Sequence, residues 1–164
     1  MNGRWVRAGA AGAAAAACLP VSGCTVVEGA VTGVSRSADG TAMVAVAVCT
    51  GSIDAAVFYD PVVGDASTVG WRHEGAVTDF AMWPLAGDRG WKLDKPLPAL
   101  EPGHRYGVYA ATHDDTNSGT HVEFTVQDLK ALAVGQVRYR LDGSDSPVTA
   151  SVASFRAHAC DSMR

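Results

Sequence analysis

Two histidines flank a polar segment whose residue types would suit a metal ion. His113 and His121 stand at the two ends of the stretch DDTNSGT, and Asp114 and Asp115 directly follow the first histidine. If this stretch is the tip of a hairpin, cross-strand pairing brings the imidazoles within reach of one cation, with carboxylates as further ligands. Asp115 and Asn117 hint at calcium, although a fixed frame of ligands is missing. Polar residues at a loop tip are more often simply solvated, so both interpretations stay open.

The aromatic residues form a second candidate for binding chemistry. Exposed aromatic rings stack on sugars and anchor protein partners, and the mature chain offers Tyr59, Trp71, Trp83, Trp91 and Tyr109. A β-sandwich also needs large rings in its core, and we expect Trp83 and Tyr106 to serve there. Tyr109 has the opposite strand phase to Tyr106, so we predict that Trp91 and Tyr109 are exposed and form a binding patch.

Motifs for catalysis are absent from the sequence. The chain contains no G-x-S-x-G, H-E-x-x-H, S-x-x-K or P-loop pattern, and no acidic pair stands out for glycoside hydrolysis. We therefore expect neither enzymatic activity nor a cofactor. The formal net charge of −4 argues against a nucleic-acid partner, which requires a basic patch.

The N-terminal segment has the pattern of an export signal. Arg4 and Arg7 precede the thirteen uncharged residues from Ala8 to Pro20. A helix that spans a bilayer needs about 20 apolar residues, so this segment fits the apolar region of a signal peptide better than a membrane span. The tetrapeptide Val21-Ser22-Gly23-Cys24 that follows resembles the lipobox of bacterial lipoproteins.

This resemblance implies a lipid anchor on Cys24. In such lipoproteins the cysteine thiol receives diacylglycerol and a peptidase cleaves before it, which here would remove residues 1–23 as the signal peptide. Two acyl chains anchor a protein stably, so we expect the protein at the extracellular face of the cell membrane. The alternative is an ordinary secretory signal with Cys24 as a structural cysteine.

The remaining cysteines favour a disulfide. The chain has four cysteines, of which Cys18 leaves with the signal peptide and Cys24 carries lipid. Cys49 and Cys160 then remain in an oxidising compartment, where an even number of thiols favours pairing. The bond would close a loop of about 110 residues and stabilise the fold by up to ~4–5 kcal/mol. A zinc site is disfavoured because no C-x-x-C spacing exists.

The pattern of the mature chain predicts an all-β domain. Hydrophobic residues make up 48% of the sequence, enough for a real core in a single domain. Residues 24–40 form the lipidated N-terminus with a short tether or first strand, and residues 41–164 form the domain. Residues 41–49 are apolar and β-branched, which predicts a central strand covered on both faces. Further strands are expected at 53–59, 68–71, 76–83, 91–93, 106–110, 121–126, 136–141 and 147–150, with a helical turn at 127–132 and a helix at 152–159 capped by Ser151.

Two resemblances refine this prediction. The segment from Leu100 to Tyr106 resembles the L-x-P-G-x-x-Y corner of fibronectin type III domains. It implies an antiparallel immunoglobulin/fibronectin-like β-sandwich with short C-terminal helical additions, in which the Tyr106 hydroxyl fastens the corner and Tyr106, Val108 and Ala110 face inward. The whole layout is also similar to small actinobacterial lipoproteins of unknown function, through the lipobox, the early and late cysteines and the stretch that contains Phe124-Thr125, Asp128-Leu129, Leu132 and Gly135-Gln136-Val137.

Three functions follow as hypotheses. The first is a non-enzymatic module that binds an envelope protein or a cell-wall polymer through loops or an exposed sheet edge. The second is a metal-dependent enzyme or accessory protein that uses the segment between His113 and His121, and it requires those side chains to converge. The third is a spacer that coats the membrane.

Overall fold

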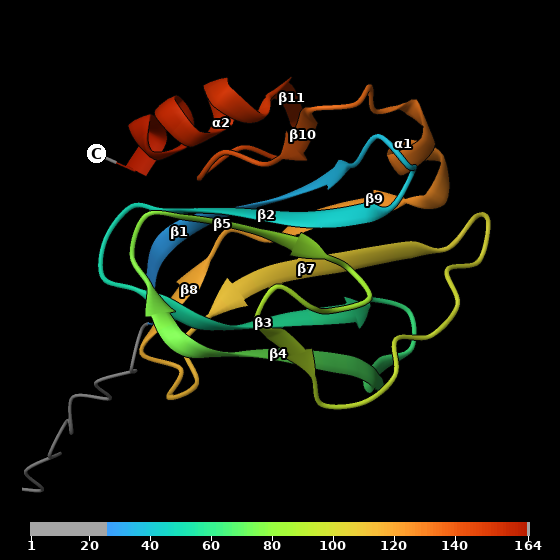
Figure 1. The fold of residues 1–164 in the computed structure, drawn as a ribbon, viewed down its shortest axis with the longest axis horizontal. Coiled ribbons are helices and arrows are strands. Elements are labelled where there is room, and N and C mark those ends of the chain that lie inside the picture. The colour runs from blue at the N-terminus through green and yellow to red at the C-terminus, as the bar shows by residue number, and fades with distance from the viewer. Residues whose placement is uncertain (1–25, 164) are drawn as a thin grey trace, which may run out of the picture.

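The structure, a computed structural model, describes residues 26–163, apart from the side chains of residues 65–67. It confirms an all-β fold with short helical additions near the C-terminus (Figure 1). The strands are β1 (Val27–Arg36), β2 (Ala42–Val48), β3 (Ile53–Asp60), β4 (Gly64–Val77), β5 (Phe80–Pro84), β6 (Trp91–Leu93), β7 (Arg105–Ala111), β8 (Asn117–Gly119), β9 (Val122–Thr125), β10 (Gln136–Tyr139) and β11 (Val148–Ser151). The helices are α1 (Val126–Ala131) and α2 (Val152–His158), followed by a 3-10 turn over Ala159–Met163. Within residues 26–163, no helix is long and apolar enough to cross a bilayer.

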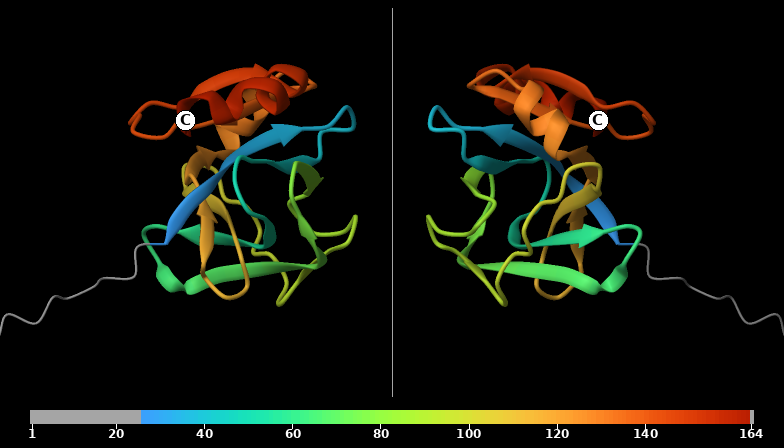
Figure 2. Two further views of the ribbon diagram at one scale, coloured as in Figure 1. Left: turned by 90° about the vertical axis from the view of Figure 1, so that its left-hand side faces the viewer. Right: turned by 90° about the vertical axis from the view of Figure 1, so that its right-hand side faces the viewer.

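The strands form two facing layers that are joined along one side. The first layer contains β1, β2, β5, β10 and β11, and the second contains β3, β4, β6, β7 and β9. The start of β1 pairs in parallel with β8, and β8 pairs with β7, so the layers belong to one mixed sheet that curls into a nearly closed barrel (Figure 2). The prediction of a wholly antiparallel sandwich is therefore wrong at the β1–β8 pair. In the described part of the chain β9 pairs only with β7, and β10 pairs only with β1 and β11, which leaves a seam between β9 and β10.

The expectation that residues 41–49 form a central, doubly covered strand is confirmed. β2 lies between β1 and β5. Its side chains alternate between two hydrophobic clusters: Val44 and Val46 face the core between the layers, whereas Ala45 and Ala47 face the second cluster under α2. An unbroken apolar strand is stable here because both of its faces lose contact with water.

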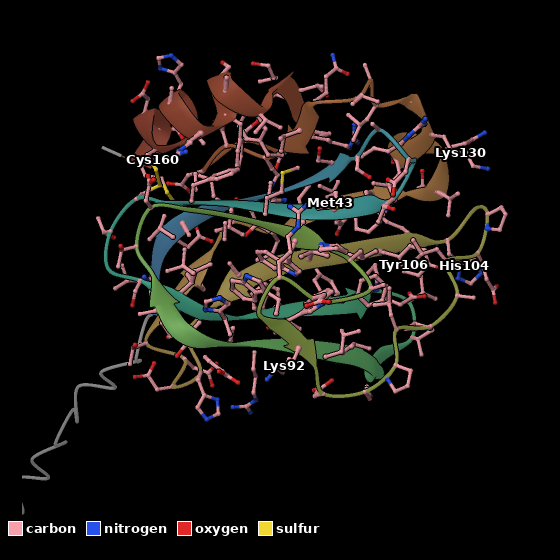
Figure 3. The ribbon with its side chains drawn as sticks, viewed as in Figure 1. Met43, Lys92, His104, Tyr106, Lys130 and Cys160 are labelled. Carbon is pink, nitrogen blue, oxygen red and sulfur yellow. A yellow bond between two sulfur atoms is a disulfide. The ribbon has the colours of Figure 1, made fainter. Side chains whose placement is uncertain are left out.

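The corner predicted around Tyr106 is present. The Tyr106 hydroxyl accepts a hydrogen bond of 2.8 Å from the backbone N–H of Glu101, and the ring stacks 5.3 Å from Phe58 in the core. Val108 and Ala110 are fully buried, as their strand phase predicts. Figure 3 shows Tyr106 beside His104, at the end of the molecule opposite to Cys160.

The predicted disulfide between Cys49 and Cys160 is also present. Ser151 caps α2 by accepting a hydrogen bond from the backbone N–H of Ser154, and Phe155 fills the cluster between α2 and the first layer. The disulfide fastens the chain after α2 to the end of β2, at the same end of the molecule as the start of β1 (Figures 1 and 3).

Two strand boundaries differ from the prediction. Residues 68–71 and 76–83 were expected as separate strands, but β4 runs without a break from Gly64 to Val77 and the turn comes at residues 78–79. Residues 72–75 lack apolar side chains, so the sequence showed no strand pattern there. These residues are largely exposed to solvent, so this part of β4 forms without packing against the core. The predicted 114–119 turn is shorter: Thr112 and Asn117 close a loop of residues 113–116, and β8 begins at Asn117.

Candidate functional site

Three aromatic side chains meet on the outer face of the second layer. Tyr59 of β3, Tyr109 of β7 and His121, the residue before β9, form what we call the aromatic platform. The rings of Tyr109 and His121 are stacked, with centroids 4.2 Å apart and an angle of 12° between planes. The hydroxyl of Tyr59 and Nδ1 of His121 share a hydrogen bond of 3.1 Å. All three side chains are only half-buried, so a ligand can reach them.

The platform depends on a glycine that lies under the Tyr59 ring. Gly107 pairs with Tyr59 across β3 and β7, and Glu123 of β9 lies opposite Gly107 on its other side. A Cβ atom at Gly107 would lie 2.1 Å from Cζ of Tyr59. The missing side chain therefore lets the Tyr59 ring lie across β7 and reach His121.

Tyr59 points outward because it alternates with the core-facing Phe58. The register of β3 against β4 shifts between Ile53 and Ala55, with the extra residues in β4. Ile53 is buried, yet after the shift Ala56 and Phe58 face the core while Val57 and Tyr59 face outward. The prediction that all odd residues from 53 to 59 share one face is therefore wrong at Ile53, which lies beyond this irregularity in the pairing.

A hollow of about 280 Å³ borders the platform. Val57, Tyr59, Tyr109 and His121 line its floor, and the turn after β3 forms its rim. At the tip of that turn Val62 is 86% exposed and Val63 is 57% exposed. Apolar side chains this accessible at the rim of an aromatic hollow are typical of a contact surface.

A polar groove follows the seam between β9 and β10, and at its edge lies Glu123, which pairs with the Gly107 that underlies the Tyr59 ring. Its first part, of about 230 Å³, is lined among others by Arg105 and Glu123 on one side and by Arg138 and Arg140 on the other. A second part of about 190 Å³ shares Arg140 and Asp145 with the first and extends along the turn between β10 and β11. The seam that the sheet leaves open thus becomes a groove beside the platform.

Paired charges line part of this groove. Arg105 donates a hydrogen bond of 3.0 Å to Glu123, and Arg138 lies 3.6 Å from Asp128. Asp128 is held in turn by a capping box, in which it accepts the backbone N–H of Thr125. Within residues 26–163, the guanidinium of Arg140 forms no hydrogen bond or ion pair, and the buried Nε of Arg138 has no hydrogen-bond partner.

The pKa directions show that the platform and the groove share one electrostatic environment. Burial lowers the pKa of His121, and the nearby positive charge of Arg140 lowers it further while Glu123 opposes the shift. Burial raises the pKa of Tyr59, Glu123 raises it further and Arg140 opposes the shift. Both rings therefore respond to the same two groove residues and are neutral at pH 7.

The predicted metal site does not assemble. The guanidinium of Arg72 contacts the ring of His113, with Nη1 2.9 Å from Nε2, and this cation disfavours a metal ion there. His121 is engaged by the two tyrosines instead. Asp114 serves the turn: hydrogen bonds from the side chain and backbone of Thr116 help to lower its pKa from 3.8 to about 2.

The two remaining candidates for metal binding do not contribute to a metal site either. Asp115 adopts a positive φ of 56° at the tip of the loop. Asn117 is buried and donates to the backbone carbonyls of Thr50 and Ser52, so it fastens the neighbouring turn. Within residues 26–163, no three metal-ligating side chains lie close enough to hold an ion.

Of the two predicted binding aromatics, Tyr109 lies on the surface but Trp91 does not. Trp91 is 2% exposed and stacks on Trp83, with centroids 3.8 Å apart. Trp71 lies edge-on to Trp83, at 6.2 Å. The prediction of an exposed Trp91 is wrong because β6 pairs with β4 and directs the indole between the layers, where Trp83 of β5 meets it.

Sequence reasoning named Tyr59 and His121 but did not bring them together, and it missed Gly107 and Arg140. A glycine inside a strand signals the close approach of another group. Gly107 is such a glycine, and it lies between two residues whose side chains face the core. No local signal could have assigned Arg140, because its position beside the seam depends on the pairing of β10 with β1, a strand from the other end of the described chain.

The chain matches no protein-family model, no curated protein and no solved structure. The lipobox, the signal peptide and Cys24 lie outside the described residues. They remain predictions, as does the resemblance to actinobacterial lipoproteins.

Proposed function

We propose that this protein is a lipid-anchored, extracytoplasmic binding module that contacts an envelope ligand through the aromatic platform. The lipid is carried by Cys24 after removal of residues 1–23. The ligand is an envelope protein or a cell-wall polymer, and the protein itself performs no catalysis. The observation that carries the binding role is the contact of Tyr59, Tyr109 and His121 at the surface beside an apolar hollow.

The disulfide supports the extracytoplasmic location. Disulfides persist in oxidising compartments and are rare where thiols are kept reduced. The pairing of Cys49 with Cys160 also leaves Cys24 without a need for a structural partner, in keeping with its use as the lipid attachment site.

The geometry supports presentation of the platform away from the membrane. Cys24 precedes β1 by three residues, which span at most about 11 Å when extended. The lipid would therefore hold the end where β1 begins close to the membrane. The turn after β3, which forms the rim of the hollow, lies at the opposite end of the molecule (Figure 1).

We further propose that the fold is a variant of the immunoglobulin/fibronectin-like sandwich. The two-layer arrangement and the hydrogen bond from the Glu101 backbone to the Tyr106 hydroxyl support this relation. The variant adds β10, β11 and α2 to the first layer. The platform would then occupy a sheet face that lies free of these additions.

The non-enzymatic assignment rests on the state of the polar groups. The side chains that sequence patterns suggested for metal chemistry are engaged in a turn or beside a cation, as at Asp114 and His113. In the platform His121 is held by Tyr59 and Tyr109, and no carboxylate among residues 26–163 is hydrogen-bonded to its ring.

Two measurements test the proposal. First, fractionation of cells that express the wild type or Cys24→Ala should show the wild type in the membrane and the variant released. Second, purified envelope should retain the soluble domain, and Tyr109→Ala should reduce retention at least tenfold. His158→Ala is the matched control, since His158 is exposed on α2, which packs against the first layer, and its ring pairs with Asp161 in the described part of the chain. Equal retention of Tyr109→Ala and the wild type would refute the platform as the binding surface.

A further inference from the structure

We propose, building on the function proposed above, that the platform and the groove form one continuous site for a neutral polysaccharide whose sugars carry vicinal hydroxyls. One sugar ring lies against Tyr59 and Tyr109 in the hollow. The neighbouring sugars follow the groove between β9 and β10, where arginine and carboxylate groups bind their hydroxyls.

The chemistry of the lining favours sugars. A pyranose has apolar C–H faces and a rim of hydroxyls that both donate and accept hydrogen bonds. Aromatic rings cover the apolar face. Arginine supplies a fork of donors and a carboxylate supplies acceptors, so a pair such as Arg105 and Glu123 matches two adjacent hydroxyls.

The charge balance favours a neutral polymer. The first part of the groove is lined by three arginines, Arg105, Arg138 and Arg140, and by three carboxylates, Glu123, Asp128 and Asp145. With equal numbers of both signs, this part of the groove has no net charge, and the second part adds two further carboxylates, Glu28 and Asp142, so nothing here would attract an anionic polymer. A neutral, hydroxyl-rich chain uses both signs at once.

Unused hydrogen-bonding capacity lies where the sugars would bind. Arg140 lines both parts of the groove, and neither it nor Asp145 forms a hydrogen bond or ion pair within residues 26–163. Arg140 is only partly buried, so its guanidinium donors are accessible, and ligand hydroxyls can bind to them and to the Asp145 carboxylate.

The continuity of the site favours a chain over a single sugar. The hollow and the two parts of the groove measure about 280, 230 and 190 Å³. Each is small compared with sites for drug-sized ligands, which reach about 300–1,000 Å³. Glu123 joins the hollow to the groove, since it lines the groove and pairs with Gly107, over which the Tyr59 ring of the hollow lies, and Arg140 joins the two parts of the groove. A row of small, connected subsites fits consecutive sugar units.

The decisive test treats the envelope chemically before binding. Periodate cleaves vicinal diols of sugars, whereas protease removes proteins. Retention of the soluble domain on envelope material should survive protease digestion and fall at least tenfold after mild periodate oxidation. Loss of retention after protease alone would overturn the inference while leaving the proposed binding function intact. No retention on untreated envelope would instead refute the proposed function itself.

A second experiment locates the contact. In affinity gel electrophoresis with soluble neutral polysaccharides released from the protease-treated envelope, wild-type mobility should fall as polysaccharide is added. Tyr109→Ala and Arg140→Gln should each weaken this effect at least fivefold, whereas His158→Ala should behave like the wild type. Near-ultraviolet circular dichroism confirms that each variant is folded. Weakening by Tyr109→Ala but not by Arg140→Gln would exclude the groove and overturn the continuous site.

Discussion

Two aromatic groups lie on opposite faces of the second layer, and they behave differently. Inside, Trp71 and Trp91 meet Trp83 of the first layer, and all three are almost fully buried. Outside, Tyr59 and Tyr109 meet His121 and remain half-exposed. The inner group fills the space between the layers, whereas the outer group lies over Gly107 of β7 and leaves part of its surface accessible.

The two groups also differ in how the polar atoms of their rings are hydrogen-bonded. The indole N–H groups of Trp71 and Trp83 are buried without hydrogen-bond partners within residues 26–163, a cost that the large buried apolar area offsets. The polar atoms of the outer group are hydrogen-bonded to each other or remain accessible. Aromatic content therefore does not identify a binding surface; the face of the sheet and the polar atoms of the rings do.

The largest expected effect is the loss of an inner ring. Trp83→Ala should lower the free energy of unfolding by about 3–5 kcal/mol because it removes a fully buried indole and leaves a cavity. Tyr109→Ala should cost less than about 1 kcal/mol, since much of its ring is accessible. Urea unfolding followed by circular dichroism measures both. Similar losses for the two variants would contradict the distinction between the two groups.

Removal of the disulfide should separate stability from binding. Cys49→Ser/Cys160→Ser should lower the free energy of unfolding by roughly 2–5 kcal/mol, because the bond spans 111 residues and restricts the unfolded chain. Retention on envelope, measured at a temperature where the variant is still folded, should be unchanged because the platform lies on the other layer. A tenfold loss of retention in the folded variant would show that α2 and its surroundings take part in binding.

Gly107→Ala should damage the outer group while sparing the inner one. The new methyl group would overlap the Tyr59 ring, so Tyr59 must turn away from His121. We expect a loss of about 1 kcal/mol in stability and a fivefold or greater loss of envelope retention. Gly75→Ala is the control, since a Cβ atom at Gly75 would have no neighbour within 4 Å. If Gly107→Ala is retained on envelope as well as the wild type, the position of the Tyr59 ring across β7 has no role in binding.

The smallest expected effect concerns protonation of the outer group. Burial and Arg140 hold the pKa of His121 below its usual 6.5, so the folded protein binds this proton less readily than the unfolded chain. The contribution of His121 to stability is therefore neutral above pH of about 6.5 and becomes unfavourable as the pH falls through that value toward the lower folded pKa. An NMR titration of the His121 ring should show the lowered pKa, and Arg140→Gln should move it upward. An unchanged titration in Arg140→Gln would place the guanidinium too far away to join the platform and the groove.

Local periodicity and residue chemistry were enough to predict several features. These are the apolar run of β2, the Tyr106 corner, the Ser151 cap of α2 and the pairing of Cys49 with Cys160. Each depends on strand alternation, a short hydrogen-bonding motif or an even number of thiols. Such signals lie within a few residues of each other, or follow from counting.

Which face of each strand is covered, and which strands meet, depends on contacts between distant segments. The irregular pairing of β3 with β4 separates the phase of Tyr59 from that of Ile53, and the pairing of β6 with β4 buries Trp91. The parallel β1–β8 pair joins segments about 90 residues apart. The open seam beside Arg140 arises because β9 and β10 do not pair with each other. Alternation specifies that successive side chains point to opposite faces, but the cover over a face comes from distant parts of the chain, which no local pattern encodes.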